Sequence, residues 1–292
     1  MTLALDATAP TDALVALVVS VLYRGTALPV AWAIVPGNQP GAGAPHILRL
    51  FAALEPARPA ARTVLVLADR GLWSPALWET LCAHGWTPLL RVHNHVIVTP
   101  RGEAPRPAHT LVSGPGHAWV GRARLGTPKK RRRWCTVLVV WEEGETAPGT
   151  LVTSLAPEAV GVWWYSLRVW IELGFRVLKS LGWQWERTRR RDCVRAARHW
   201  LVLAVATLWT VADGARVDDA SRVAVSPARL RAAPPVPSAP PPRAVSVVAS
   251  GLAWLRLHLA RRTLWSVLWL TPDPRPAPSP SLRLTFQQSR SP

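Results

Sequence analysis

Residues 63–71 of this chain have the sequence TVLVLADRG, in which a wholly apolar run ends at Asp69 and Arg-Gly follows. A short run of Val and Leu bounded by turn residues is typical of a buried strand. Residues 2–6, TLALD, repeat this pattern and end at Asp6. Sheet proteins often place ligand-binding groups at strand ends, where the backbone is fixed and the side chain stays accessible. Both aspartates are therefore candidate site residues, although an aspartate after a strand also serves as a turn or helix cap.

The apolar runs around these aspartates predict an α/β fold. The runs at 2–5, 14–23 and 28–35 are separated by turn signals and indicate three strands in a meander. A helix, a strand, a second helix and another strand are then expected at 45–55, 63–68, 74–84 and 87–91. This order favours a mixed sheet flanked by helices.

The stretch from about 92 to 147 is rich in Gly, Pro, His and Arg and predicts an inserted β-rich subdomain, with strand-like pieces at 96–99 and 134–141. Strand texture returns at 151–154. Two helices, 157–181 and 192–212, are expected to close a first domain of residues 1–215. The rest is expected to be a Pro-rich linker at 216–250 and a tail at 251–292 with one amphipathic helix.

The charge balance favours a polyanionic partner. The chain has 35 Lys and Arg against 17 Asp and Glu, a net charge of +18, and each phosphate that such cations neutralise releases condensed counterions. Nucleic acid is the first candidate and an anionic membrane surface the second. The longest apolar run, 201–212, is shorter than the about 20 residues that span a bilayer. Three scattered cysteines suggest neither a zinc site nor a disulfide framework, which fits a cytoplasmic protein.

The helix expected at 157–181 carries a polar stripe. Tyr165, Arg168, Glu172 and Lys179 are offset by 3, 7 and 14 residues. At about 100° per residue these positions lie within about 60° of arc, on one face. A buried amphipathic helix needs one polar stripe in any case, so periodicity alone favours this ordinary explanation over a functional site. Apolar neighbours surround Glu172, where a carboxylate is costly without a partner such as a metal or Arg168.

Taken together, LALDAT around Asp6, LADRG around Asp69 and the Tyr-(2)-Arg-(3)-Glu-(6)-Lys spacing from Tyr165 resemble the DDE insertion-sequence transposases of the IS-four type. The resemblance covers about residues 2–213 and implies an RNase H-like catalytic domain with a β-rich insertion before the last catalytic helix.

The resemblance implies that Asp6, Asp69 and Glu172 are both the catalytic residues and the metal ligands. It implies two Mg²⁺ ions, for which Mn²⁺ can substitute, and hard oxygen ligands suit such ions. Water would cut the transposon end and the freed 3′-hydroxyl would attack target DNA. Tyr165, Arg168 and Lys179 would hold phosphates near the cut end. A homodimer in the DNA complex, no membrane, and a place in the cytoplasm with the nucleoid belong to the same expectation.

Two basic runs add candidate DNA contacts. The first, 122–133, has seven cations and no acid; the second, 187–198, has six arginines. The residues expected to bind the DNA backbone are Lys129, Lys130, Arg131, Arg132, Arg133, Arg189 and Arg190, although a solvated charged face would have the same composition. Trp119, Trp134 and Trp141 could stack on an unpaired base or belong to the core.

Family members carry a DNA-binding region before the first acidic residue, so an N-terminal truncation is expected here. Two alternatives stay open: a different RNase H-like nuclease, and a DNA-binding remnant without activity.

Overall fold

The amino-terminal strands form the predicted antiparallel meander. The computed structural model describes residues 1–37, 43–59, 62–126, 133–224, 245–263, 269–271 and 285–287. Its first strands are β1 (Thr2–Thr11), β2 (Leu14–Tyr23) and β3 (Thr26–Pro36). Arg24 and Gly25 both have positive φ (48° and 87°), which suits the two-residue turn between β2 and β3. β1 continues past its expected end at residue 5, so Asp6 lies within the strand and opposite Val18.

Two parallel strands follow beside β1. β4 (Leu65–Ala68) pairs with β1 and with β5 (Thr87–Val92), in each case in parallel. The helices predicted between these strands are present as α1 (Gly43–Leu54) and α2 (Pro75–Ala83), with short 3-10 turns η1 (Glu55–Ala57) and η2 (Arg70–Leu72). The Ser74 side chain caps α2 by accepting from the Leu77 amide, and Pro75 occupies the first helical position.

The region predicted as an inserted subdomain is β-rich, but its strands continue the same sheet. They are β6 (Ile97–Pro100), β7 (Arg106–Pro107), β8 (His117–Leu125), β9 (Arg133–Val140) and β10 (Gly149–Thr153), with the 3-10 turn η3 (Ala108–Leu111). β10 pairs with both β5 and β9 and so joins the two parts. The strand order is β3-β2-β1-β4-β5-β10-β9-β8-β6-β7, and β11 (Thr285–Gln287) pairs with β8.

The segment expected to form one long helix, 157–181, is a series of different helical turns. It begins with 3-10 turns η4 (Pro157–Ala159) and η5 (Val162–Arg168), continues as α3 (Val169–Arg176), and ends in the π-helical turn η6 (Val177–Leu181). Another 3-10 turn, η7 (Trp185–Thr188), follows. The prediction of a single α-helix was wrong. Residues 160–165 combine β-branched and aromatic side chains, which are weak helix formers, with Gly161.

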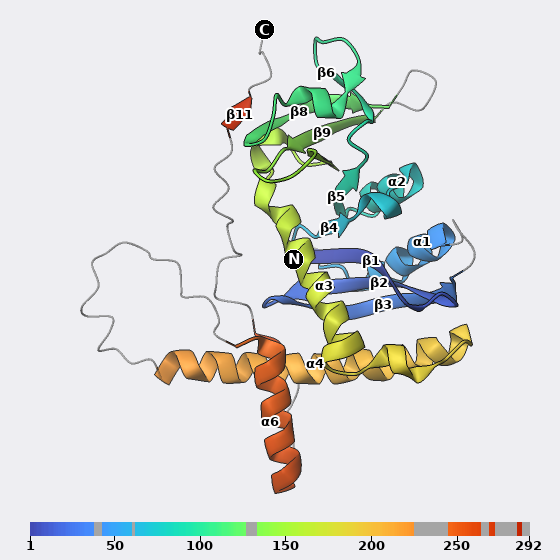
Figure 1. Ribbon diagram of the computed structural model, residues 1–292, viewed down its shortest axis with the longest axis vertical. Coiled ribbons are helices and arrows are strands. Elements are labelled where there is room, and N and C mark those ends of the chain that lie inside the picture. The colour runs from blue at the N-terminus through green and yellow to red at the C-terminus, as the bar shows by residue number, and fades with distance from the viewer. Residues whose placement is uncertain are drawn as a thin grey trace, which may run out of the picture.

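Helices cover both faces of the sheet. α1 and α2 pack on one face, where Leu5 and Phe51 are fully buried. On the other face α3 and the long helix α4 (Cys193–Ala224) pack on Ala4 and Leu67 through Ile171 and Trp200. Figure 1 shows α3 lying across the sheet near β1 to β3, with α4 beneath it. Because side chains alternate along a strand, residues 4, 6, 67 and 69 point to the α3 face.

The carboxy-terminal helices differ from the predicted boundaries. α4 runs to Ala224, beyond the expected end at 212, and α6 spans Val247–Arg261. The linker predicted over 216–250 is therefore helical at both ends, and the two helices pack on one another through Val211, Ala215, Val247 and Val248. The proline cluster at 227–243 lies outside the described residues. Within the described part, one helical stretch, Cys193–Ser221, is long and apolar enough to cross a membrane by length and composition, and half of its apolar window is buried in the protein.

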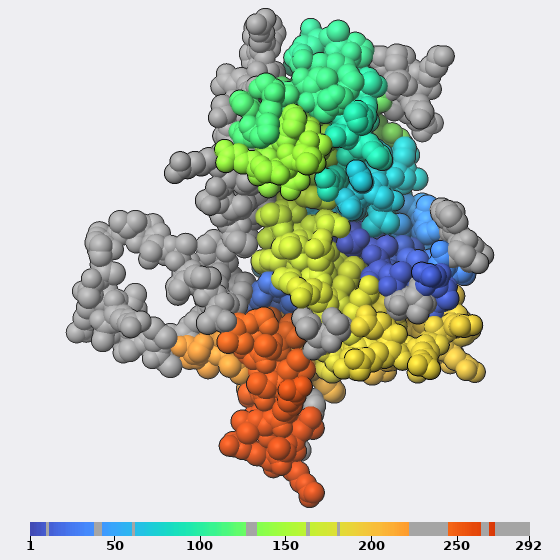
Figure 2. Space-filling model, in the orientation of Figure 1, coloured from blue at the N-terminus to red at the C-terminus, as the bar shows by residue number. Residues whose placement is uncertain are grey.

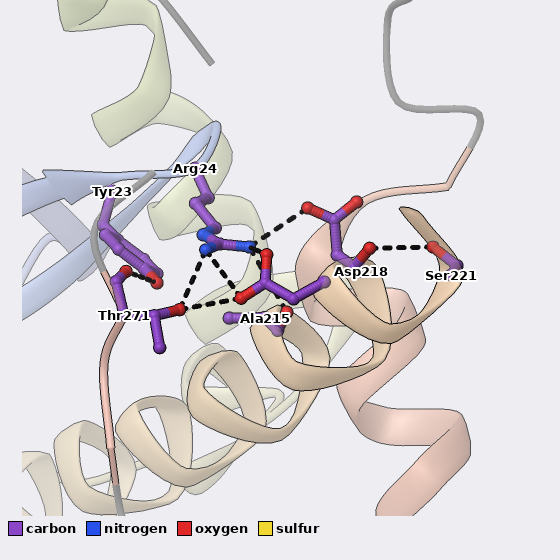
Figure 3. A network of polar contacts seen from close by, with 7 residues as sticks. Tyr23, Arg24, Ala215, Asp218, Ser221 and Thr271 are labelled. Atoms are coloured by element: carbon purple, nitrogen blue, oxygen red, sulfur yellow. Dashed lines mark hydrogen bonds and ion pairs between the residues drawn. The ribbon is translucent and has the colours of Figure 1, made fainter. Parts of the chain in front are cut away.

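A buried arginine connects the β2–β3 turn to the carboxy-terminal segments (Figure 3). The Arg24 side chain is fully buried and forms ion pairs with Asp218 (3.1 Å) and Asp219 (2.8 Å) on α4. It also donates to the hydroxyl of Thr271 (2.9 Å), whose carbonyl accepts a hydrogen bond from Tyr23 (2.5 Å). Removing one partner of a buried ion pair costs about 3–5 kcal/mol, so this network fixes α4 against the sheet.

Candidate active site

Asp6 and Asp69 lie side by side because β1 and β4 are parallel neighbours. Leu5 pairs with Ala68, so the residue that follows each of them is an aspartate at the same level of the sheet. Each carboxylate is oriented by a backbone amide: Ala7 donates to Asp6 and Arg70 donates to Asp69, both at 2.8 Å. The two aspartates therefore lie on neighbouring strands, Asp6 within β1 and Asp69 directly after β4.

Asp69 also caps the 3-10 turn η2. The capping bond uses Oδ1, while Oδ2 lies 3.5 Å from Arg168. The cap and the site are therefore compatible, because the two oxygens of one carboxylate serve different partners. Arg91 at the end of β5 lies 3.8 Å from the same group.

Glu172 comes to the site from α3, one turn after Arg168. Its side chain is 57% exposed, and its carboxylate forms an ion pair with Arg168 at 3.0 Å. The sequence predicted apolar surroundings except along the polar stripe of the helix, and the exposed Glu172 side chain lies on the solvent side of that helix. The apolar neighbour Ile171 is fully buried under the helix, whereas Glu172 lies on the solvent side of the same turn.

Arg168 joins all three acidic residues. Its Nη2 lies 3.2 Å from Asp6 Oδ2 and 3.5 Å from Asp69 Oδ2, and its Nη1 lies 3.0 Å from Glu172 Oε1. Three carboxylates from β1, β4 and α3 thus converge on one guanidinium. Figure 2 shows the yellow-green segment that contains α3 at the surface beside the dark blue amino-terminal strands. Since the Glu172 side chain is more than half exposed, the site borders solvent.

The helical turns explain how Tyr165 and Arg168 reach the same place. A 3-10 helix has three residues per turn, so residues 165 and 168 of η5 lie above one another. The Tyr165 hydroxyl donates to Asp69 at 3.4 Å. Arg168 and Glu172 are four residues apart across the start of α3, the spacing at which α-helical side chains meet. Lys179 lies farther along and donates to the carbonyl of Ala9 at 3.1 Å.

Close packing at Gly174 sets the height of α3 above the sheet. A Cβ added to Gly174 would lie 2.9 Å from the Cβ of Ala27 and 3.0 Å from its carbonyl oxygen. Contacts this short do not occur between real side chains, so only glycine allows α3 to approach β3 so closely. Glu172 is two residues away and depends on that approach for its position.

The electrostatics of the site follow from partial burial. Burial raises the pKa of Asp6, although the Ala7 amide and Arg168 act in the opposite direction. Burial, together with the neighbouring Asp69, raises the pKa of Tyr165, so the phenol stays protonated and can donate. Burial would lower the pKa of Arg168, but the surrounding carboxylates outweigh it and raise that pKa.

The ligand type suits a divalent metal ion because carboxylate oxygens are hard donors. In this structure the three carboxylates bind the Arg168 guanidinium. In the ranges that the structure describes, no three Asp, Glu, His or Cys side chains are arranged so that they could hold a metal ion.

The predicted DNA-binding residues have different surroundings. Lys129, Lys130, Arg131 and Arg132 lie outside the described residues. Arg133 forms an ion pair with Glu79, and its side chain is largely buried. Arg189 and Arg190 are exposed just before α4.

The tryptophans considered as candidates for base stacking also differ in their surroundings. Trp119 belongs to the core, whereas Trp134 is 46% exposed and lies under the Arg124 guanidinium, 4.8 Å from the ring centroid. The sequence analysis missed Arg91 as a site residue. Arg91 is the one cation in the stretch 87–92, which is otherwise mostly apolar. It lies two residues after Leu89 and therefore on the same face of the strand, and this pattern could have identified it.

Fold and site together define an α/β protein that has a mixed sheet flanked by helices and three carboxylates converging at one point. The chain belongs to the transposase DDE domain family, whose model matches residues 19–209, more than half of the chain. That match includes Asp69 and Glu172 and begins after Asp6. The family is one of nucleases and strand transferases that act on DNA, and DDE domains generally use divalent metal ions.

Among curated proteins none matches the chain. Of the solved structures, the cryo-EM structure of a piggyBac transposase synaptic complex with hairpin DNA is similar, with a TM-score of 0.41 and 10% sequence identity. The similarity covers 70% of this chain and 45% of that one, so this chain spans less than half the length of that protein.

Proposed function

We propose that this chain carries the catalytic site of an IS-four-type transposase, with Asp6, Asp69 and Glu172 as the catalytic acidic residues. The observation that supports the proposal is that three carboxylates, far apart in sequence, reach one guanidinium. The Tyr-(2)-Arg-(3)-Glu-(6)-Lys spacing from Tyr165 supports the IS-four type.

The proposed reaction is an in-line displacement at a DNA phosphate, carried out twice. Water first attacks the phosphodiester at the transposon end and releases a 3′-hydroxyl, which then attacks a phosphodiester of the target. The three carboxylates would hold two Mg²⁺ ions, or Mn²⁺ in their place, which activate the attacking oxygen and stabilise the leaving one when bound. The amides of Ala7 and Arg70 orient the aspartates before the substrate arrives.

Three neighbouring side chains are proposed to position the DNA. Arg168 can form two parallel hydrogen bonds to a phosphate, and the protonated Tyr165 hydroxyl can donate one more. Lys179 supplies a point charge at the end of β1, where it now donates to Ala9. The exposed Arg189 and Arg190 extend the cationic surface, and we propose Lys129, Lys130, Arg131 and Arg132 as further contacts.

The test is Glu172→Gln, which keeps the side-chain shape and removes the charge that holds a cation. Nicking of labelled DNA carrying the element's terminal repeat, in Mg²⁺ or Mn²⁺, should be lost while DNA binding persists. Glu186→Gln is the matched control, because Glu186 is exposed on η7 and should be dispensable. Equal nicking by Glu172→Gln and wild type would remove Glu172 from the site. Binding without nicking by the wild type would favour a DNA-binding remnant, and nicking without joined products a different nuclease.

A further inference from the structure

The position of Arg168 has a consequence for cation binding. Its two terminal nitrogens use one oxygen each of Asp6, Asp69 and Glu172. Those oxygens are the hard donors that a divalent ion would need. The guanidinium and a divalent cation cannot both lie between the three carboxylates. Both are positively charged and repel each other, and both would use the lone pairs of the same carboxylate oxygens.

Arg168 is not saturated where it lies. Its Nε is buried and has no hydrogen-bond partner among the described residues. The Glu172 end of the cluster is open to solvent, and the guanidinium is on a flexible side chain. A phosphate can accept two hydrogen bonds from a guanidinium in the same bidentate geometry as a carboxylate. A DNA phosphate can therefore replace the acidic residues as the partner of Arg168.

We propose that Arg168 is a positioning residue that competes with the divalent metal for Asp6, Asp69 and Glu172, and that a DNA phosphate releases it. The inference rests on the proposed function and deepens it. Arg168 holds three like charges together until DNA arrives; when Arg168 turns to the phosphate, the carboxylates become available to the cation. Metal uptake and DNA binding are then coupled, and by thermodynamic linkage each strengthens the other.

Calorimetric titration of the full chain with MnCl₂ tests the competition. Arg168→Gln should bind Mn²⁺ about tenfold more tightly than wild type, a difference of about 1.4 kcal/mol. It should also melt at a lower temperature without Mn²⁺ and gain more from Mn²⁺. Arg176→Gln is the matched control, since Arg176 is exposed on the same helix and should leave the Mn²⁺ affinity unchanged.

A second arm tests the coupling. A short DNA duplex should lower the Mn²⁺ dissociation constant of the wild type by more than that of Arg168→Gln, because the variant has no guanidinium to release. Ions bound by the duplex itself are the same in both titrations and cancel.

The outcomes separate the two proposals. Equal or weaker Mn²⁺ binding by Arg168→Gln would show a merely structural ion pair and overturn the competition, while the proposed catalytic site would stand. No Mn²⁺ uptake by wild type and Arg168→Gln, with or without the duplex, would overturn both. If Arg168→Gln does not fold, Arg168→Lys keeps a charge that cannot bridge three carboxylates and should still bind Mn²⁺ more tightly than wild type. An unchanged affinity in the Lys variant would then count against the competition.

Discussion

Gly214 of α4 and Gly251 of α6 face one another where the two helices cross. A Cβ on Gly214 would lie 1.8 Å from the Val247 carbonyl oxygen, and a Cβ on Gly251 would lie 1.8 Å from the Thr210 carbonyl oxygen. The crossing therefore brings backbone against backbone. Figure 1 shows α6 crossing α4 and projecting away from it. No side chain at either position fits without moving a helix.

Gly251→Ala should separate α6 from α4. A methyl group cannot be accommodated by rotating a side chain, because the atoms in its way are backbone. We expect a loss of about 1–3 kcal/mol in the free energy of unfolding, measured by urea denaturation, as for other overpacked contacts. Gly114→Ala is the control: an added Cβ there meets nothing within 4 Å. A neutral Gly251→Ala would mean that α6 does not pack on α4 as described.

The raised pKa of Asp6 makes a prediction about stability and pH. Because burial raises this pKa in the folded protein, the folded state binds the proton more tightly than the unfolded state does. Between the ordinary value of 3.8 and the raised value, stability falls as pH rises, and the penalty stays above that window. Asp6→Asn should therefore be more stable than wild type at neutral pH, and the difference should shrink on acidification towards pH 4.

Thermal unfolding at a series of pH values measures this effect in solutions without divalent ions. A variant less stable than wild type at neutral pH would show that the ion pair with Arg168 outweighs burial.

The surroundings of the arginines predict which of them contact DNA and which form structural ion pairs. Arg189 and Arg190 are exposed, whereas Arg133 is paired with Glu79. Each phosphate contact contributes about −0.9 to the slope of log affinity against log salt. Replacing Arg189 and Arg190 together by Ala should flatten that slope by up to about 1.8, and Arg133→Ala should leave it nearly unchanged. Fluorescence anisotropy of labelled duplex DNA across salt concentrations gives the slopes, and the reverse ranking would contradict the assignment.

How much of this could be predicted from the sequence depends on the range of the interactions. Apolar runs such as 14–23 and 63–68 identified strands because burial on both faces leaves a continuous signal. β8 was missed because its outward positions carry Arg122 and Arg124, and its partner strand β9 is separated from it in sequence by the basic stretch 127–132. The winding of 162–181 was also missed, since a change from 3-10 to α to π depends on how the segment packs on the sheet.

The sequence proposes the residues of the candidate site but not the connections between them. Strand ends made Asp6 and Asp69 candidates, and the resemblance to the IS-four type added Glu172 and implied that the three act together. The pairing of β1 with β4 brings the two aspartates together. Nothing local to the sequence places Arg168 between all three, because that requires the packing of α3 on β3. The exposure of Glu172 has the same origin: it depends on which side of α3 faces the sheet.

That packing leads to the last prediction, which concerns Gly174. In Gly174→Ala the new methyl group would meet Ala27 at 2.9 Å, so α3 must rise by a few tenths of an ångström or more. Alanine favours the helix by about 1 kcal/mol over glycine, which offsets part of an overpacking cost of about 1–3 kcal/mol. Stability should therefore fall by at most about 2 kcal/mol, while the Glu172 carboxylate moves relative to Asp6 and Asp69. Since a displacement of about 1 Å can cost about a hundredfold in rate, the DNA-nicking rate should fall by more than the loss of stability explains. The nicking rate and the melting temperature of the variant are measured together.

Ala27→Gly, added to Gly174→Ala, is the control. It removes the contact with the Ala27 Cβ but leaves the contact with the carbonyl oxygen at 3.0 Å, so it should restore the nicking rate in part. If Gly174→Ala cut DNA at the wild-type rate, the height of α3 would not position Glu172.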